Sequence, residues 1–201
     1  DFNLSPLITN LLNNRAFATS NELDRFLNPS TKYFHNPFLM KGMEKSIRRI
    51  FKALSLNETI FILGDSDADG ISAASIIFNQ LKEQGGKVKA LILNREEDGR
   101  GLSRKLIKKV LKVNSAVLIT CDLGINDHDL IDFATKNGVD VIIADHHLPL
   151  KKNSSAYSII NPKQVNCIYP FKELSASGIA LKLVQGMDKF KSKGSVGIND
   201  A

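Results

Sequence analysis

The chain has 201 residues, of which 43% are hydrophobic and 24% are charged, and this composition excludes an intrinsically disordered protein or a small disulfide-dependent scaffold. Its apolar runs are far shorter than the roughly 20 residues that cross a bilayer, so we expect no membrane span. The net charge of +6 favours polyanionic partners only moderately, because scattered basic residues also suit solvated helix faces.

The first 55 residues are predicted to form a helical lead-in, with a short helix at 22–27 and a longer one at 39–54. The chain begins without a basic leader, an apolar leader segment or an initiator Met, so we expect a trimmed end and a cytoplasmic protein. After residue 56, apolar β-branched runs predict buried strands that alternate with helical patterns. The strands are expected at 59–63, 88–93, 116–121, 139–144 and, more weakly, 158–160, and the helices at 71–84, 103–113, 127–137 and 175–187.

The alternation over residues 56–187, with connections too long for hairpins, predicts βαβ units. The expected fold is α/β, with an open, mainly parallel, doubly wound sheet and helices on both faces. Residues 188–201 are rich in Lys, Gly and Ser and are expected to form a linker or tail. Cys121 and Cys167 show no CxxC spacing, so both are expected to be reduced thiols.

An acidic segment, GDSDADG at 64–70, places Asp65, Asp67 and Asp69 directly after the first predicted strand. Carboxylates this close repel one another unless cations neutralise them, and their hard oxygens suit Mg²⁺, Mn²⁺ or Ca²⁺. An EF-hand calcium loop is a poor alternative, because its twelfth position is Ile76 instead of Glu and a strand precedes it. A second alternative, in which the carboxylates only cap the next helix, stays open for this segment alone.

Two further strand ends carry residue types that bind metals. Asp122 follows the third predicted strand, and the triplet DHH at 145–147 follows the fourth. Because the carboxyl ends of parallel strands meet at one edge of a sheet, all three groups should converge. This mixture of carboxylates and imidazoles suits a two-cation site that hydrolyses phosphoesters, with Mn²⁺ slightly favoured. Asp122 is our candidate for a ligand that bridges both cations, while Asp67 and Asp69 would each face a different one.

These motifs resemble those of the DHH phosphoesterase family. The triplet in IIADHHLP is similar to the family signature, and GDSDADGISAA, CDLGI and SASGIALKL resemble its other motifs. Within the family, the RecJ branch of single-strand-specific DNA exonucleases is the best match. Its pattern is followed in order by LLNNRAFATSNELDRFLNP, HNPFLMKGMEKSIRRI, LNREEDGRGLS and INPKQVNCIYPFKELSASG, so the resemblance covers roughly residues 5–187.

The resemblance implies a role for each residue at the three strand ends. The implied metal ligands are Asp67, Asp69, Asp122 and His146. Asp65 would bind a cation directly or support a ligand. His147 would contact the scissile phosphate, where a protonated imidazole stabilises charge or assists the leaving oxygen, and Asp145 would hold both imidazoles in orientation.

Residues for substrate binding are implied in two other places. Arg95 matches an Asn-Arg pair of the family and would clamp a phosphate, unless it only forms a surface ion pair with Glu96 or Glu97. Ser177 and Gly178 lie near the start of a predicted helix, where backbone N–H groups favour an anion, although an ordinary helix cap explains them equally well.

The family also supplies a later metal-ligating Asp and then a second domain that completes a nucleic-acid cleft. Asp188 lies in a Lys-rich context that does not fit that Asp, whereas Asp200 in SVGINDA is a loose match and our candidate. We expect no second domain of this kind within the 201 residues.

The function that the resemblance implies is metal-dependent hydrolysis of single-stranded DNA from 5′ to 3′, in DNA repair and recombination. Two divalent cations are implied as cofactors, with Mn²⁺ favoured and Mg²⁺ possible. The implied partners are single-stranded DNA and single-strand-binding or helicase proteins, and nothing indicates an oligomeric state. Two alternatives stay open: a phosphodiesterase of the same family that acts on short oligonucleotides or cyclic dinucleotides, and a non-catalytic DNA-replication scaffold.

Overall fold

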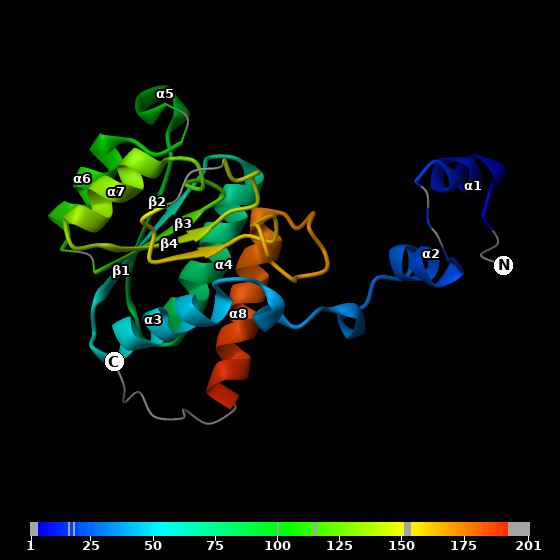
Figure 1. Ribbon diagram of the computed structural model, residues 1–201, viewed down its shortest axis with the longest axis horizontal. Coiled ribbons are helices and arrows are strands. Elements are labelled where there is room, and N and C mark those ends of the chain that lie inside the picture. The colour runs from blue at the N-terminus through cyan, green and yellow to red at the C-terminus, as the bar shows by residue number, and fades with distance from the viewer. Residues whose placement is uncertain are drawn as a thin grey trace. The chain divides into compact units, whose positions relative to one another are not determined.

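The computed structural model describes residues 4–15, 17, 19–99, 101–114, 116–150 and 154–192 (Figure 1). The chain divides into two compact units, one that ends at Asn36 and one that begins at Pro37. This boundary differs from the predicted end of the lead-in at residue 55, because the second predicted helix packs within the larger unit. Among the described residues, no helix is both long and apolar enough to cross a membrane.

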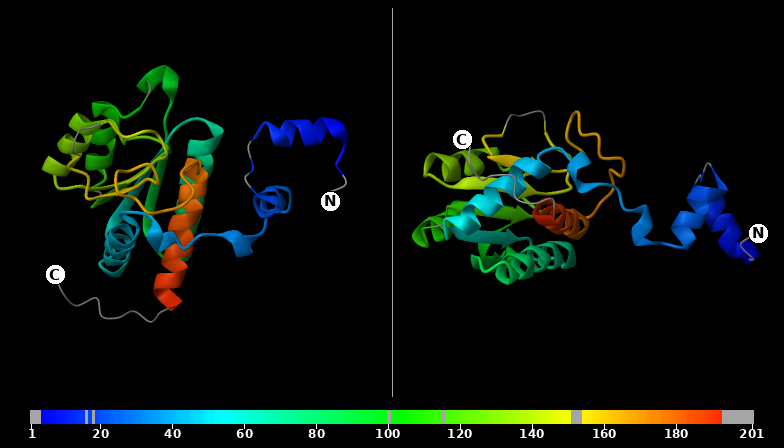
Figure 2. Two further views of the ribbon diagram at one scale, coloured as in Figure 1. Left: turned by 45° about the vertical axis from the view of Figure 1, so that its right-hand side comes forward. Right: turned by 90° about the horizontal axis from the view of Figure 1, so that it is seen from below.

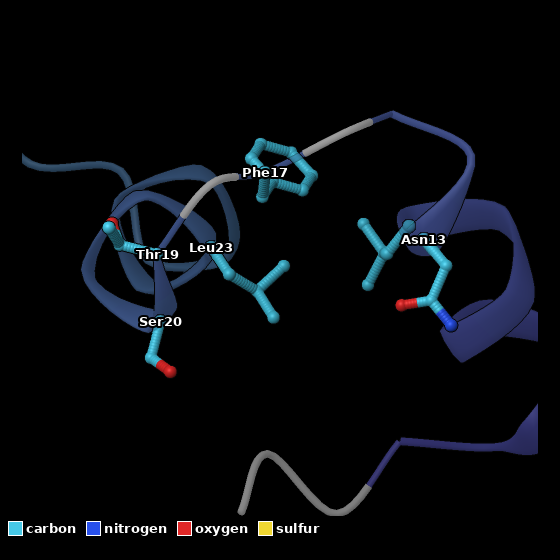
Figure 3. A pocket seen from close by; sticks show the side chains of 6 residues that line it. Asn13, Phe17, Thr19, Ser20 and Leu23 are labelled. Carbon is cyan, nitrogen blue, oxygen red and sulfur yellow. The ribbon is translucent and has the colours of Figure 1, made fainter.

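The smaller unit contains α1 (Pro6–Asn13), α2 (Ser20–Leu27) and the 3-10 helix η1 (Thr31–Tyr33). The prediction includes α2 but omits α1. A capping box starts α2, with the Thr19 hydroxyl accepting the Glu22 N–H and the Glu22 carboxylate accepting the Thr19 N–H. A hollow of about 300 Å³ lies within this unit (Figure 3), lined by Leu12, Asn13, Phe17, Thr19, Ser20 and Leu23. None of these six side chains ionises, so the hollow offers no acid, base or charged ligand.

The larger unit is built on a five-stranded sheet with the order β2-β1-β3-β4-β5, and all neighbouring strands pair in parallel. This arrangement confirms the predicted α/β fold. The weak fifth strand is present, and β2 lies at an edge, where several of its side chains are exposed. The strands are β1 (Thr59–Gly64), β2 (Lys87–Ile92), β3 (Val117–Cys121), β4 (Asp140–Ala144) and β5 (Ser158–Ile160).

Helices cover both faces of the sheet, as predicted (Figure 2). Successive strand residues point to opposite faces, so in β1 Ile60 and Ile62 belong to one apolar cluster while Phe61 and Leu63 belong to the other. The first cluster is closed by α3 (Met43–Ser55), α4 (Ala68–Glu83) and α8 (Ala176–Ser192), and the second by α6 (Arg104–Lys112) and α7 (His128–Lys136).

Helix α3 follows the short 3-10 helix η2 (Pro37–Leu39) and is part of the sheet domain. Its buried residues join the same cluster as those of α4 and α8. Gly42 precedes it with φ +85, and a Cβ there would lie 2.1 Å from the Ile159 carbonyl oxygen. The Ser46 and Ser158 hydroxyls lie 2.7 Å apart and bind α3 to β5. Residues 43–55 therefore support the sheet that carries the strand-end residues.

The last described helix is longer than predicted. Because α8 continues to Ser192, the prediction of a linker from residue 188 is wrong for residues 188–192. Gln80 of α4 donates to the Asp188 carboxylate at 3.1 Å, and Lys191 donates to the Gln84 side chain at 2.9 Å. These polar contacts extend the packing of α8 along α4 beyond its apolar face.

Candidate metal centre

The predicted site residues lie where the strand order reverses. The chain leaves β1 for β2, which pairs with one edge of β1. It then returns to β3, which pairs with the other edge of β1, and continues to β4 beyond β3. A crevice opens at the carboxyl ends of strands at such a switch point. The acidic segment leaves β1 there, Asp122 leaves β3, and the DHH triplet leaves β4.

The structure brings these three strand ends together. Two groups of side chains each have ligand atoms within 4.8 Å of one another: Asp65, Asp67 and Asp122 form one, and Asp122, His146 and His147 form the other. The Nε2 atom of His146 lies 3.2 Å from Asp122 Oδ1, and Nδ1 of His147 lies 4.0 Å from the same oxygen. Asp122 is common to both groups and stays our candidate for a ligand that bridges two cations.

Asp122 is the least solvated of the clustered metal-binding candidates, with a side chain only 4% exposed. Its backbone is left-handed, with φ +66, a conformation that Asn and Asp adopt more readily than most residues. The Oδ1 atom accepts no hydrogen bond from any residue that the structure describes. Burial raises the pKa of this carboxyl to about 7, and three neighbouring aspartates add to the rise. A buried oxygen that accepts no hydrogen bond and is surrounded by like charges fits a divalent cation.

The raised pKa of Asp122 leads to a prediction about protein stripped of divalent cations. The native state holds this proton more tightly than the unfolded chain, so the free energy of unfolding falls as pH rises from about 4 to about 7. Asn has no charge to bury, so we expect Asp122→Asn to be more stable than the wild type at pH 8 by roughly 1–3 kcal/mol. Thermal unfolding with a chelator measures this difference. An advantage as large at pH 5 as at pH 8 would contradict the prediction.

Arg95, the first residue of α5 (Arg95–Asp98), pairs with the acidic segment. Its guanidinium donates to both oxygens of Asp65, at 2.8 and 3.3 Å, and to Asp67 at 3.3 Å. Burial opposes the ionisation of Asp65, but Arg95 and the Ser66 N–H outweigh it and hold the pKa of Asp65 below its ordinary value. Arg95 therefore supplies positive charge to the cluster, a contact that neither interpretation of the sequence includes.

Asp67 and Asp69 both support helix ends. Asp67 caps α4 by accepting the N–H groups of Asp69 and Gly70, as the capping alternative predicts, while its other oxygen faces Arg95. Asp69 accepts the N–H of Ala176 at 2.7 Å and that of Ser177 at 2.8 Å. Burial opposes its ionisation, but the donors at the start of α8 outweigh it and lower the pKa of Asp69.

These contacts change the expectation for Ser177 and Gly178. The anion at the N-terminus of α8 is the Asp69 carboxylate, while the Gly178 N–H donates to the Ser175 hydroxyl at 3.1 Å. The backbone N–H groups predicted to bind a substrate anion therefore hold partners within the protein. The Nε2 atom of His146 lies 3.8 Å from Asp69, so Asp69 borders the metal-binding cluster while it fixes α8 to α4.

Asp145 orients the histidine beside it. It is 1% exposed and accepts the N–H groups of Ile125 and His147, each at 3.1 Å. Its Oδ1 also lies 2.7 Å from Nδ1 of His147. Burial lowers the pKa of His147, but the contact with Asp145 outweighs that effect and raises it. Asp145 thus holds the Nδ1 side of a half-exposed imidazole, and the ring is more readily protonated than an ordinary histidine.

A cavity of about 400 Å³ lies against this cluster and is lined by Asp65, Asp122, Asp145 and His147 together with Arg95. Gly101 and Asp127 also line this cavity, and neither belongs to the predicted site. Cys121 and Cys167 are buried free thiols, as expected. Asp200, the predicted last ligand, lies outside the described residues.

Comparison with known proteins identifies the family of this chain. The family model "DHH family, N-terminal domain" matches residues 59–199. Among curated proteins, the single-stranded-DNA-specific exonuclease RecJ of Bacillus subtilis (strain 168) is 36% identical over 184 residues. The aligned region is 92% of this chain and 23% of that protein, so the chain spans less than a quarter of this relative.

Two solved structures are similar to the larger part of the chain. A crystal structure of exonuclease RecJ bound to manganese has a TM-score of 0.69 and 27% identity, and the match covers 77% of this chain and 39% of the other. RecJ from Thermus thermophilus in complex with Mn²⁺ has a TM-score of 0.65 and 25% identity, covering 76% of this chain and 22% of the other.

Proposed function

Because this chain belongs to the DHH family, we propose that it forms the metal-binding part of an exonuclease that hydrolyses single-stranded DNA from the 5′ end. The observation that carries the proposal is the buried Oδ1 of Asp122, which accepts no hydrogen bond among the described residues and lies among carboxylates and imidazoles from three strand ends. The names of the relatives support the choice of single-stranded DNA over other phosphoesters.

Two divalent cations fit the donors that converge here, with Mn²⁺ preferred and Mg²⁺ as the alternative. The cations would be held by Asp67, Asp69, Asp122 and His146, with Asp65 as a further ligand or support and Asp200 as the last ligand. When bound, such cations neutralise the phosphate and lower the pKa of the attacking water. Manganese is present in solved structures of RecJ relatives, which supports this choice.

The chain's own side chains supply the remaining functions. Asp145 accepts a hydrogen bond from Nδ1 of His147. The other ring nitrogen, Nε2, is then left to approach the scissile phosphate. The raised pKa of His147 favours the imidazolium, which stabilises developing negative charge or protonates the leaving oxygen. Arg95 is half exposed, and its planar guanidinium suits a phosphate. The guanidinium would be free to bind it when a cation replaces Arg95 as the partner of Asp65.

Strand-labelling assays test this function. The full-length protein with Mn²⁺ is incubated with a single strand labelled at its 5′ end and with the same strand labelled at its 3′ end. We expect immediate release of the 5′ label as a mononucleotide and progressive shortening of the 3′-labelled strand. A chelator should abolish both. Rapid cleavage of a dinucleotide or cyclic dinucleotide with both long strands intact would favour the short-substrate alternative, and binding without cleavage would favour a scaffold.

The cellular setting is proposed on the same basis. An exonuclease of this kind acts in DNA repair and recombination in the cytoplasm, where single-strand-binding or helicase proteins supply its substrate. The net charge of +6 agrees with a polyanionic substrate. Copurification of the full-length protein with a single-strand-binding protein, lost in high salt, is the corresponding measurement.

A further inference from the structure

We propose that Asp127 is a positioning residue that holds the loop carrying Arg95 against the metal-binding cluster. This inference rests on the proposed function, because it assigns Arg95 to the substrate phosphate. The loop runs from the end of β2 through α5 to the start of α6, and Asp127, directly before α7, lines the same cavity as Arg95 and Gly101 of this loop.

The carboxylate of Asp127 binds the loop rather than its own helix. Asp127 occupies the residue before α7, yet its side chain caps no N–H of that helix. Instead its Oδ2 accepts the N–H of Leu102 at 3.2 Å. Burial raises the pKa of this carboxyl, and the Leu102 N–H opposes that rise. A partly buried carboxylate at a helix N-terminus usually accepts an N–H of that helix, but this one accepts an N–H of the loop. We infer that it positions the loop.

Gly101 allows this close approach. It has φ +77, which side-chain-bearing residues rarely adopt. A Cβ at this position would lie 3.3 Å from both carboxylate oxygens of Asp127. The glycine thus brings the loop backbone directly against Asp127, and any larger residue would push the two apart.

The loop is held on both sides of Arg95. Leu93 and Leu102 are 3% and 6% exposed and belong to the apolar cluster beneath α6 and α7. Between them, Arg95 extends to Asp65 and Asp67 with a half-exposed side chain. The Asp127–Leu102 hydrogen bond therefore holds the C-terminal end of the loop that carries Arg95. Removal of this contact releases the loop without changing any residue of the metal-binding cluster.

Steady-state kinetics of the full-length protein on single-stranded DNA test this role. We expect Asp127→Ala to raise KM about five- to tenfold with a smaller change in kcat, because a hydrogen bond that orients a binding group is lost. Asp127→Asn keeps an oxygen that accepts the Leu102 N–H and should recover most of the loss. Asp129→Asn, an exposed aspartate in the first turn of the same helix, is the matched control and should keep the wild-type KM.

A double-mutant cycle shows whether Asp127 acts through Arg95. If it does, the double variant has nearly the same KM as Arg95→Ala. If the two residues act independently, the fold-changes in KM of the two single variants multiply in the double variant. Multiplied effects would overturn the proposal, and so would an Asp127→Ala enzyme with the wild-type KM.

Amide hydrogen exchange over residues 101–106 separates this inference from the proposed function. We expect faster exchange in Asp127→Ala and unchanged exchange in Asp129→Asn. If the wild type degrades no single strand, the proposed function fails, and faster exchange still supports the Asp127–Leu102 contact. Unchanged exchange in Asp127→Ala overturns the inference whatever the activity.

Discussion

Asp122→Asn is expected to lower kcat of the full-length protein on single-stranded DNA by roughly a thousandfold or more. The substitution removes the one carboxylate common to both groups of metal-binding side chains among the described residues. Asn adopts the left-handed backbone at φ +66 about as readily as Asp, so the fold is kept while the charge is lost. Hydrolysis of a 5′-labelled strand in Mn²⁺ measures the loss.

The control for this variant is Asp188→Asn. Asp188 lies near the end of α8, is exposed, and accepts a hydrogen bond from Gln80, which an amide oxygen also accepts. We expect wild-type activity from it. If Asp122→Asn is as active as the wild type, the assignment of the metal centre is wrong, since no other described carboxylate belongs to both groups.

Asp145→Ala is expected to lower kcat roughly a hundredfold and the free energy of unfolding by about 2–4 kcal/mol. The stability falls because Asp145 is 1% exposed and the N–H groups of Ile125 and His147 lose their acceptor. The activity falls because the His147 ring loses the partner at Nδ1 that fixes its orientation. Thermal unfolding and kinetics on the same preparations measure the two effects.

The pH profile of kcat tests the charge of Asp145 separately from its role as a hydrogen-bond acceptor. The contact with Asp145 raises the pKa of His147 in spite of burial, so the imidazolium persists to higher pH than in an ordinary histidine. Asp145→Asn removes the charge but keeps an acceptor, and the pKa of His147 should fall. Because the proposed role of His147 needs its protonated form, the decline of kcat on the alkaline side should move to lower pH. An unchanged profile would show that His147 acts without its proton.

Much of the site follows from the order of residue types along the chain. Apolar β-branched runs that alternate with helices lead to parallel strands, and parallel strands place their carboxyl ends at one edge. Asp65, Asp122 and His146 each lie close behind such a run, so their meeting could be predicted without coordinates. The same reasoning predicts five strands and both helical layers, because the pattern of side-chain burial is local.

Two of the predictions that failed or were incomplete concern the helices α1 and α8. The start of α1 and the extension of α8 to Ser192 depend on caps and polar contacts more than on apolar periodicity. Lys, Gly and Ser after residue 187 suggest a linker by composition, yet Lys191 of α8 donates to Gln84, the residue directly after α4. Composition does not reveal such a partner, because it lies far away in the sequence.

The amino-acid sequence alone establishes the α/β fold, the parallel sheet and the strand ends that carry the acidic and histidine residues, because strand and helix periods and the direction of parallel strands are local properties. Tertiary packing alone decides which donors the carboxylates meet. Asp69 meets the start of α8 over 100 residues away, Arg95 reaches Asp65, and Asp127 meets Leu102. Each of these contacts joins two segments that lie apart in the sequence, and their distance depends on how helices and loops pack on the sheet.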